Sequence, residues 1–185
     1  MPDVSATYLD LASRPKGELA ALFDAGTPPD VRALTGFEFR GYNQPRAAAL
    51  LGIRKFIKAF FPNGQGQPFG CNTPVRRNRL DADWIARPSP ERPRRYAFFR
   101  VEPPDPEAAD PERRGAALLD YGQGGNPRYD ISRILRDYVV RLRPGSDDLL
   151  LGKAYFVVAG TRLTHSYFLI ERYRPLADAA ALTRR

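Results

Sequence analysis

The sequence predicts a mainly β protein, an antiparallel barrel of about eight strands with an N-terminal helix and short helical caps. Three observations lead to this prediction. After residue 35, short apolar segments alternate with turn residues, a pattern typical of antiparallel sandwiches and barrels. Before residue 35, the apolar residues follow a helical period. The last two apolar segments are apolar on both faces, so a lumen and an outer layer must cover them.

The composition fits one globular domain. The chain has 185 residues, of which 43% are hydrophobic and 27% charged, as expected for a single core. It has no apolar run long enough to cross a membrane as a helix. Its first residues lack the basic and apolar regions of a secretory signal, so we expect a cytoplasmic protein. One cysteine, Cys71, and one histidine, His165, exclude a disulfide framework and a zinc site built from soft ligands.

The first predicted element is an amphipathic helix over residues 14–25. Leu19, Leu22 and Phe23 have the spacing of one helix face, and a serine and a glycine flank the segment as N-cap and stop. We therefore divide the chain into an N-terminal helical segment (1–33), a barrel domain (34–174) and a C-terminal tail (175–185) with a short helix.

The barrel strands follow in chain order. The predicted strands are Gly36–Tyr42, Ile53–Phe60, Phe69–Arg76, Tyr96–Glu102, Ala116–Tyr121, Leu135–Arg143, Leu149–Val158 and Leu163–Tyr173. Turn chemistry separates them, and the turn Pro144-Gly145-Ser146-Asp147 links its two neighbouring strands tightly enough to predict a hairpin. Helix formers after Pro45 predict two helical turns over residues 45–51. Residues 130–136 are predicted to form a helical turn before the sixth strand.

The charge has two interpretations. The net charge of +8 would attract phosphate groups. However, the densest basic segment, residues 76–95, is interrupted by prolines and is predicted to be an exposed loop. An electrostatic footprint needs cations clustered on one face. We therefore do not expect nucleic acid as the partner, and keep an Arg-rich partner-binding or nucleic-acid-binding module as an alternative.

Five segments occur in an order that resembles a bacterial family of lipocalin-like proteins of unknown function with a Gly-x-Trp-x-Gly-type motif. The segments are Gly36–Gly41, Gly52–Phe56, Leu119–Tyr121, Asp147–Lys153 and Tyr167–Arg172. The resemblance covers about residues 34–174, with Phe39 in place of the tryptophan and Arg40 as one extra residue before the second glycine. It implies a lipocalin-like barrel whose closed end is plugged by Phe39 beneath Arg172 or Arg174, and it implies no catalytic residue.

An eight-stranded barrel can hold one small ligand, and the aromatic residues of separate strands could give its cavity a few polar groups. The candidate ligand-binding residues are Arg40, Lys55, Tyr121, Tyr155, His165 and Tyr167. The tyrosines and the histidine are expected to line the cavity, while Lys55 or Arg40 would attract an anionic group at its mouth. The predicted function is non-catalytic binding of a small hydrophobic or aromatic molecule. We expect no cofactor and no metal, because a lone strand histidine is more often hydrogen-bonded than a ligand.

Other hypotheses remain open. A cyclase or isomerase of the same fold could use His165 or Glu38 as its acid–base group, because cavity shape can supply much of a barrier without a recognisable motif. The doubly apolar last strands could also be covered by a second copy of the chain in a homodimer. Three carboxylates, Glu38, Asp120 and Glu171, lie inside apolar strands. A buried charge there must be paired, and the expected partners are Arg40, Arg100 or Arg141.

Overall fold

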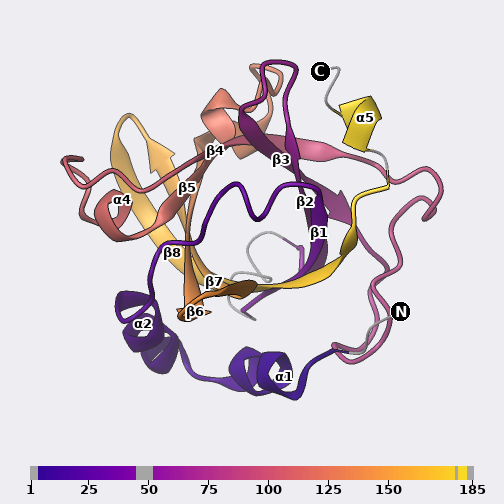
Figure 1. Cartoon of the computed structure of the whole chain (residues 1–185), viewed down its shortest axis with the longest axis horizontal. Coiled ribbons are helices and arrows are strands. Elements are labelled where there is room, and N and C mark those ends of the chain that lie inside the picture. The colour runs from indigo at the N-terminus through magenta and orange to yellow at the C-terminus, as the bar shows by residue number, and fades with distance from the viewer. Residues whose placement is uncertain (1–3, 45–51, 178, 183–185) are drawn as a thin grey trace.

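Eight antiparallel strands form a closed barrel in the order of the sequence. The computed structural model describes residues 4–44, 52–177 and 179–182. Each strand pairs with the next, and the last pairs with the first, which closes the ring (Figure 1). The strands are β1 (Phe37–Asn43), β2 (Lys55–Pro62), β3 (Pro68–Pro74), β4 (Tyr96–Glu102), β5 (Ala117–Asp120), β6 (Leu135–Arg143), β7 (Ser146–Val158) and β8 (Thr161–Pro175).

The mainly β barrel and its strand positions are confirmed. The largest differences are at the strand ends, where β7 and β8 are longer than predicted, with 13 and 15 residues. The hairpin between β6 and β7 is also confirmed, because Arg143 pairs with Ser146 across a two-residue turn. Gly145 in that turn has a φ of 76°, a backbone conformation that residues other than glycine rarely adopt.

The predicted N-terminal helix over residues 14–25 is wrong in its extent. The structure has two helices there, α1 (Ala6–Ser13) and α2 (Lys16–Asp24), and Ser5 rather than Ser13 accepts the capping hydrogen bond, from the Tyr8 backbone N–H. Pro15 explains the break, because a proline disfavours helical backbone at the residue before it. Arg14 accordingly has an extended conformation, with a ψ of 145°.

Short helices close the connections between the strands. The predicted turn before the sixth strand is the 3₁₀ helix η2 (Ile131–Ile134), and a second one, η1 (Tyr121–Gln123), follows β5. The helix α4 (Pro111–Gly115) was not predicted, and the tail contains α5 (Ala179–Leu182). The helix predicted over residues 45–51 lies outside the described residues.

Helices α1 and α2 cover the outer face of the last two strands. Tyr8, Leu19 and Phe23 from these helices are buried in one cluster with Leu151 and Leu169 of β7 and β8, and Figure 1 shows both helices outside the ring. The expectation that the doubly apolar strands need a second cover is therefore confirmed. The cover comes from the chain itself.

Three glycines make room for phenylalanine rings inside the barrel. A Cβ atom on Gly41 would lie 2.1 Å from the ring of Phe56, and one on Gly152 would lie 2.0 Å from the ring of Phe168. Gly70 has the same relation to Phe99. Each glycine lies on a strand beside the strand that carries its ring, so the rings fill the lumen at the positions where the facing side chain is absent.

An aromatic column fills one end of the lumen. The ring centroids of Phe39 and Phe60 are 5.2 Å apart, those of Phe60 and Phe99 are 5.7 Å apart, and those of Phe99 and Tyr121 are 5.1 Å apart. The guanidinium of Arg172 lies 5.1 Å from the Phe39 ring, a favourable cation–π distance. Of the two arginines expected above Phe39, Arg172 is the one that makes this contact.

Candidate ligand-binding site

The other half of the lumen is a cavity of about 630 Å³. Volumes of this size are typical of sites for small molecules. Its apolar wall includes Phe56, Tyr96, Ala97, Leu135, Phe156 and Phe168. Residues from strands all around the barrel contribute to the lining, which identifies the cavity as the barrel interior.

A buried polar network lies at the base of this cavity. The Lys58 ammonium donates hydrogen bonds to the Tyr121 hydroxyl, to Asn72 Oδ1 at 3.1 Å and to Asp137 Oδ2 at 3.1 Å. The Tyr121 hydroxyl donates in turn to Asp137 Oδ2 at 2.8 Å. Lys58 and Tyr121 are each 2% exposed, and all four side chains line the cavity. Every ammonium hydrogen therefore has an acceptor within the network.

The network is electrically balanced and enclosed by aromatic rings. Lys58 carries one positive charge and Asp137 one negative charge, in a pair that is almost completely buried. The Lys58 nitrogen also lies 4.9 Å from the ring centroid of Phe99, and the rings of Phe56 and Phe168 are at 5.3 and 5.2 Å. Burial lowers the pKa of Lys58, against the opposing effect of Asp137, because an apolar environment disfavours the charged form.

The mouth of the cavity is apolar and contains one unsatisfied hydroxyl. Ile131 and Leu163 line the cavity, although their side chains are mostly exposed to solvent. The buried hydroxyl of Ser132 has no hydrogen-bond partner among the described residues. A buried polar group without a partner costs free energy, so this hydroxyl is available to a bound molecule.

Of the six predicted site residues, only Tyr121 lines the cavity. Tyr155 and Tyr167 lie on the outer face, and the His165 ring contacts both of their rings, so the predicted place of all three in the lumen is wrong. Tyr167 pairs with Lys153 across the sheet, whereas the neighbouring pair, Gly152 and Phe168, faces the lumen. Because neighbouring residues of a strand point to opposite faces, these side chains point outward.

The two predicted cations at the cavity mouth also lie outside the barrel. Arg40 forms a buried ion pair of 2.6 Å with Glu171 and lies 5.8 Å from the ring of Trp84. Lys55 lies 3.6 Å from the same ring and donates to Asn78 Oδ1 and to two backbone carbonyls. The prediction that Glu171 is paired is confirmed, and its partner is Arg40, one of the three arginines expected. Neither cation borders the cavity mouth.

Glu38, the other acid–base candidate, is also outside the lumen. Its carboxylate accepts hydrogen bonds from Arg95 at 2.8 Å and from Arg174 at 2.6 Å. In the described part of the chain, neither Glu38 nor His165 borders the cavity. An acid–base function in the lumen would therefore have to use other residues.

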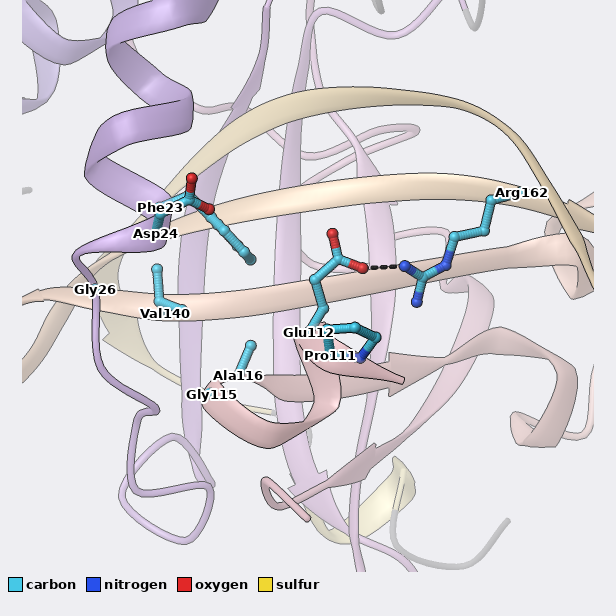
Figure 2. A pocket seen from close by; sticks show the side chains of 9 residues that line it. All are labelled: Phe23, Asp24, Gly26, Pro111, Glu112, Gly115, Ala116, Val140 and Arg162. Carbon is cyan, nitrogen blue, oxygen red and sulfur yellow. Dashed lines mark hydrogen bonds and ion pairs between the residues drawn. The ribbon is translucent and has the colours of Figure 1, made fainter. Parts of the chain in front are cut away.

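Tyr155 belongs to a charged cluster that lies beside a smaller pocket of about 370 Å³. Figure 2 shows this pocket between the end of α2 and α4, with Glu112 bonded to Arg162. The Glu112 carboxylate also binds Lys153 at 2.7 Å and accepts from the Tyr155 hydroxyl. Asp110 binds Arg162 as well. The cluster thus holds α4 against β7 and β8, and this contact is structural.

His165 gives this outer face a pH-dependent stability. Burial lowers its pKa below 6.5, and the nearby charges of Lys16 and Lys153 lower it further, against the opposing effect of Glu112. The unfolded chain then binds the proton more tightly, so the free energy of unfolding should fall as the pH drops below 6.5 towards the folded pKa. Urea titrations at pH about 7.5 and about 5.5 measure this decrease in the free energy of unfolding. The decrease should be smaller in His165→Gln than in the unchanged protein. An equal decrease in both proteins would contradict the assignment.

The Arg-rich segment is folded onto the barrel. Trp84 within it is 2% exposed, and Val75 and Ala86 form a β-bridge. The predicted exposure is confirmed for several of its arginines, including Arg76, Arg77 and Arg87. These three border a pocket outside the barrel. The sequence prediction missed the anchoring of this loop by the tryptophan.

Sequence reasoning missed three of the four residues in the lumenal network: Lys58, Asn72 and Asp137. A signal was present for Lys58, which lies two residues from both Phe56 and Phe60 in a predicted strand. The three side chains therefore share one face of that strand. A single cation between two aromatic residues on a buried face indicates a buried charge that must be paired.

No family model, curated protein or solved structure matches the chain. The resemblance to lipocalin-like proteins stays a prediction. Among the described helices, none is long and apolar enough to cross a membrane. Residues 4–44, 52–177 and 179–182 contain no group of three or more His, Cys, Asp or Glu side chains placed to hold a metal ion.

Proposed function

We propose that the protein binds a small, mainly apolar and electrically neutral molecule in the barrel lumen. The observation that carries this proposal is the network of Lys58, Asn72, Tyr121 and Asp137 at the base of an apolar cavity of about 630 Å³. Such a site combines apolar walls with a few polar groups that orient the ligand. The network would bind the polar end of the ligand, and the walls would bind its apolar body.

The charge balance of the network supports a neutral ligand. Lys58 and Asp137 compensate each other within 3.1 Å, so the described residues leave no unpaired charge at the base of the cavity to attract an anion. A buried charged group on the ligand would lose its hydration without a counter-ion. The exposed apolar side chains of Ile131 and Leu163 at the mouth also favour an apolar ligand.

Substitutions at neighbouring residues of β7 test this proposal. Ala154 lines the cavity, whereas Tyr155 points outward. Filling the lumen with Ala154→Trp should weaken binding of the neutral apolar dye Nile red by roughly tenfold or more, because the indole would occupy the dye site. The control, Tyr155→Phe, should bind the dye as the unchanged protein does. Fluorescence titration measures both, and circular dichroism verifies folding. Equal affinity in folded Ala154→Trp would contradict lumenal binding.

An acid–base enzyme acting on the same ligand class is the second candidate. The observation that favours it is the hydrogen bond from the Tyr121 hydroxyl to Asp137 at the cavity base, since a positioned pair can move a proton. A cyclase or isomerase would then use Tyr121 and Asp137 in place of the outward His165 and Glu38. Turnover that disappears in Asp137→Asn with retained dye binding would support it.

A further inference from the structure

We propose that Lys58 condenses with the carbonyl group of an aldehyde or ketone bound in the lumen, forming a Schiff base. The inference rests on the proposed function and narrows the ligand class to neutral carbonyl compounds with an apolar body. A carbonyl oxygen is an uncharged acceptor, and it would take the place of one of the acceptors that the Lys58 ammonium and the Tyr121 hydroxyl now have within the network. Lysines in apolar pockets are established nucleophiles towards carbonyl groups.

The position of Lys58 distinguishes it from the other lysines. The chain has four lysines, at positions 16, 55, 58 and 153, and only Lys58 lines the lumenal cavity. Lys153 is paired with Glu112 on the outer face, and Lys55 is held by the loop around Trp84. Lys16 lies at the start of α2, outside the barrel. A carbonyl compound bound in the lumen would therefore meet one amine.

The network contains the groups that the condensation requires. The Lys58 ammonium first gives a proton to Asp137, which lies 3.1 Å away. The free amine then attacks the carbonyl carbon, and the carbonyl oxygen, as it becomes a hydroxyl, takes a proton from Tyr121 or Asp137. If Tyr121 gave that proton, it regains one from Asp137. The attacking nitrogen then passes a proton through Asp137 to the new hydroxyl, and the C–O bond breaks, which releases water and leaves a protonated imine. In the net reaction, ammonium and carbonyl give iminium and water, so two of the three ammonium hydrogens leave with the oxygen.

The surroundings suit both the attacking amine and its product. Burial lowers the pKa of Lys58, which increases the fraction of free amine. The iminium keeps the positive charge of the ammonium, so it retains Asp137 as counter-ion. The rings of Phe56, Phe99 and Phe168 remain around the cation, a contact that stabilises positive charge.

Trapping with a hydride donor tests the inference. The intact protein is incubated with naphthaldehyde and sodium cyanoborohydride, which reduces an imine to a stable amine, and the modified lysine is located by peptide mass spectrometry. We expect the adduct to form faster at Lys58 than at Lys55. The pKa of Lys55 is also lowered, to about 8, but this lysine lies outside the lumen. Modification of Lys55 or Lys16 ahead of Lys58 would overturn the inference.

Two variants control for folding and for access. Lys58→Met should remove the adduct, and Ala154→Trp should suppress it although Lys58 is still present, because the lumen is filled. If folded Ala154→Trp is labelled at Lys58 as fast as the unchanged protein, the inference that the reaction takes place in the lumen is wrong. Tyr121→Phe should slow labelling at Lys58 by roughly tenfold or more, with the rate measured at an aldehyde concentration that saturates the site, so that a change in affinity does not affect it. An unchanged labelling rate would remove Tyr121 from the proposed step.

A non-reactive analogue separates failure of this inference from failure of the proposed function. Naphthalenemethanol has a similar shape and no carbonyl group, so it should displace Nile red without forming an adduct. If the alcohol and the dye compete but the aldehyde gives no adduct at Lys58, the lumen binds ligands and the covalent step is wrong. If neither the dye nor the alcohol binds, the proposed function itself is wrong.

Discussion

Replacing Lys58 by methionine is expected to lower the free energy of unfolding by about 3–5 kcal/mol. The substitution leaves the Asp137 carboxylate in the lumen without its counter-ion at 3.1 Å, and a buried charge without a partner is strongly destabilising. Among the residues that the structure describes, the Tyr121 hydroxyl would remain as the hydrogen-bond donor to that carboxylate. Urea denaturation of the two proteins, followed by circular dichroism, measures the difference.

A second substitution at Asp137 provides the control. In Lys58→Met/Asp137→Asn the amide can still accept the hydrogen bond of Tyr121, but no uncompensated charge remains. Most of the lost stability should therefore return. If the double variant is as unstable as Lys58→Met alone, the loss would come from the missing hydrogen bonds of the ammonium to Asn72 and Tyr121 and not from the unpaired carboxylate.

Arg40→Met is expected to cost a similar amount, about 3–5 kcal/mol, without weakening ligand binding. Arg40 forms a buried ion pair with Glu171 on the outer face of the barrel and lies near the rings of Trp84 and Tyr173. The variant leaves Glu171 unpaired but changes no side chain that lines the lumen. Thermal unfolding measures the loss, and Nile red titration of the folded variant measures the affinity.

The pair Arg40→Met/Glu171→Gln tests the cause of that loss. With both charges removed, the double variant should regain most of the stability. Weaker dye binding by folded Arg40→Met would instead return Arg40 to the ligand site, in the role that the sequence interpretation gave it.

The fold could be predicted largely because its signals are local. The strands are bounded by turn residues, and pairs such as Pro144 and Gly145 set the hairpin between β6 and β7. The main error, one helix in place of α1 and α2, arose where Pro15 breaks an otherwise helical pattern. The conformational restriction that Pro15 places on Arg14 is also local, so this break in the helix could have been predicted.

The site was harder to predict because it depends on which face of each strand points inward. In β7 and β8 both faces are apolar, so alternation gives no direction, and Tyr155 and Tyr167 were placed inside when they lie outside. The pairing of Gly152 with Phe168 shows which face of these strands points inward. That pairing can be recognised only when the register between the two strands is known. Lys58 and Asp137 come together across 79 positions of sequence, a distance that no local pattern spans.

The aromatic column from Phe39 to Tyr121, closed by Arg172, has a consequence for exchange kinetics. The described residues fill that end of the barrel, so a molecule that arrives through the mouth must depart by the same path in reverse. Substitutions of side chains at the rim, such as Ile131 and Leu163, should then change the association and dissociation rate constants of the ligand together. The equilibrium occupancy of the site is determined deeper in the barrel, by the residues that contact the bound ligand.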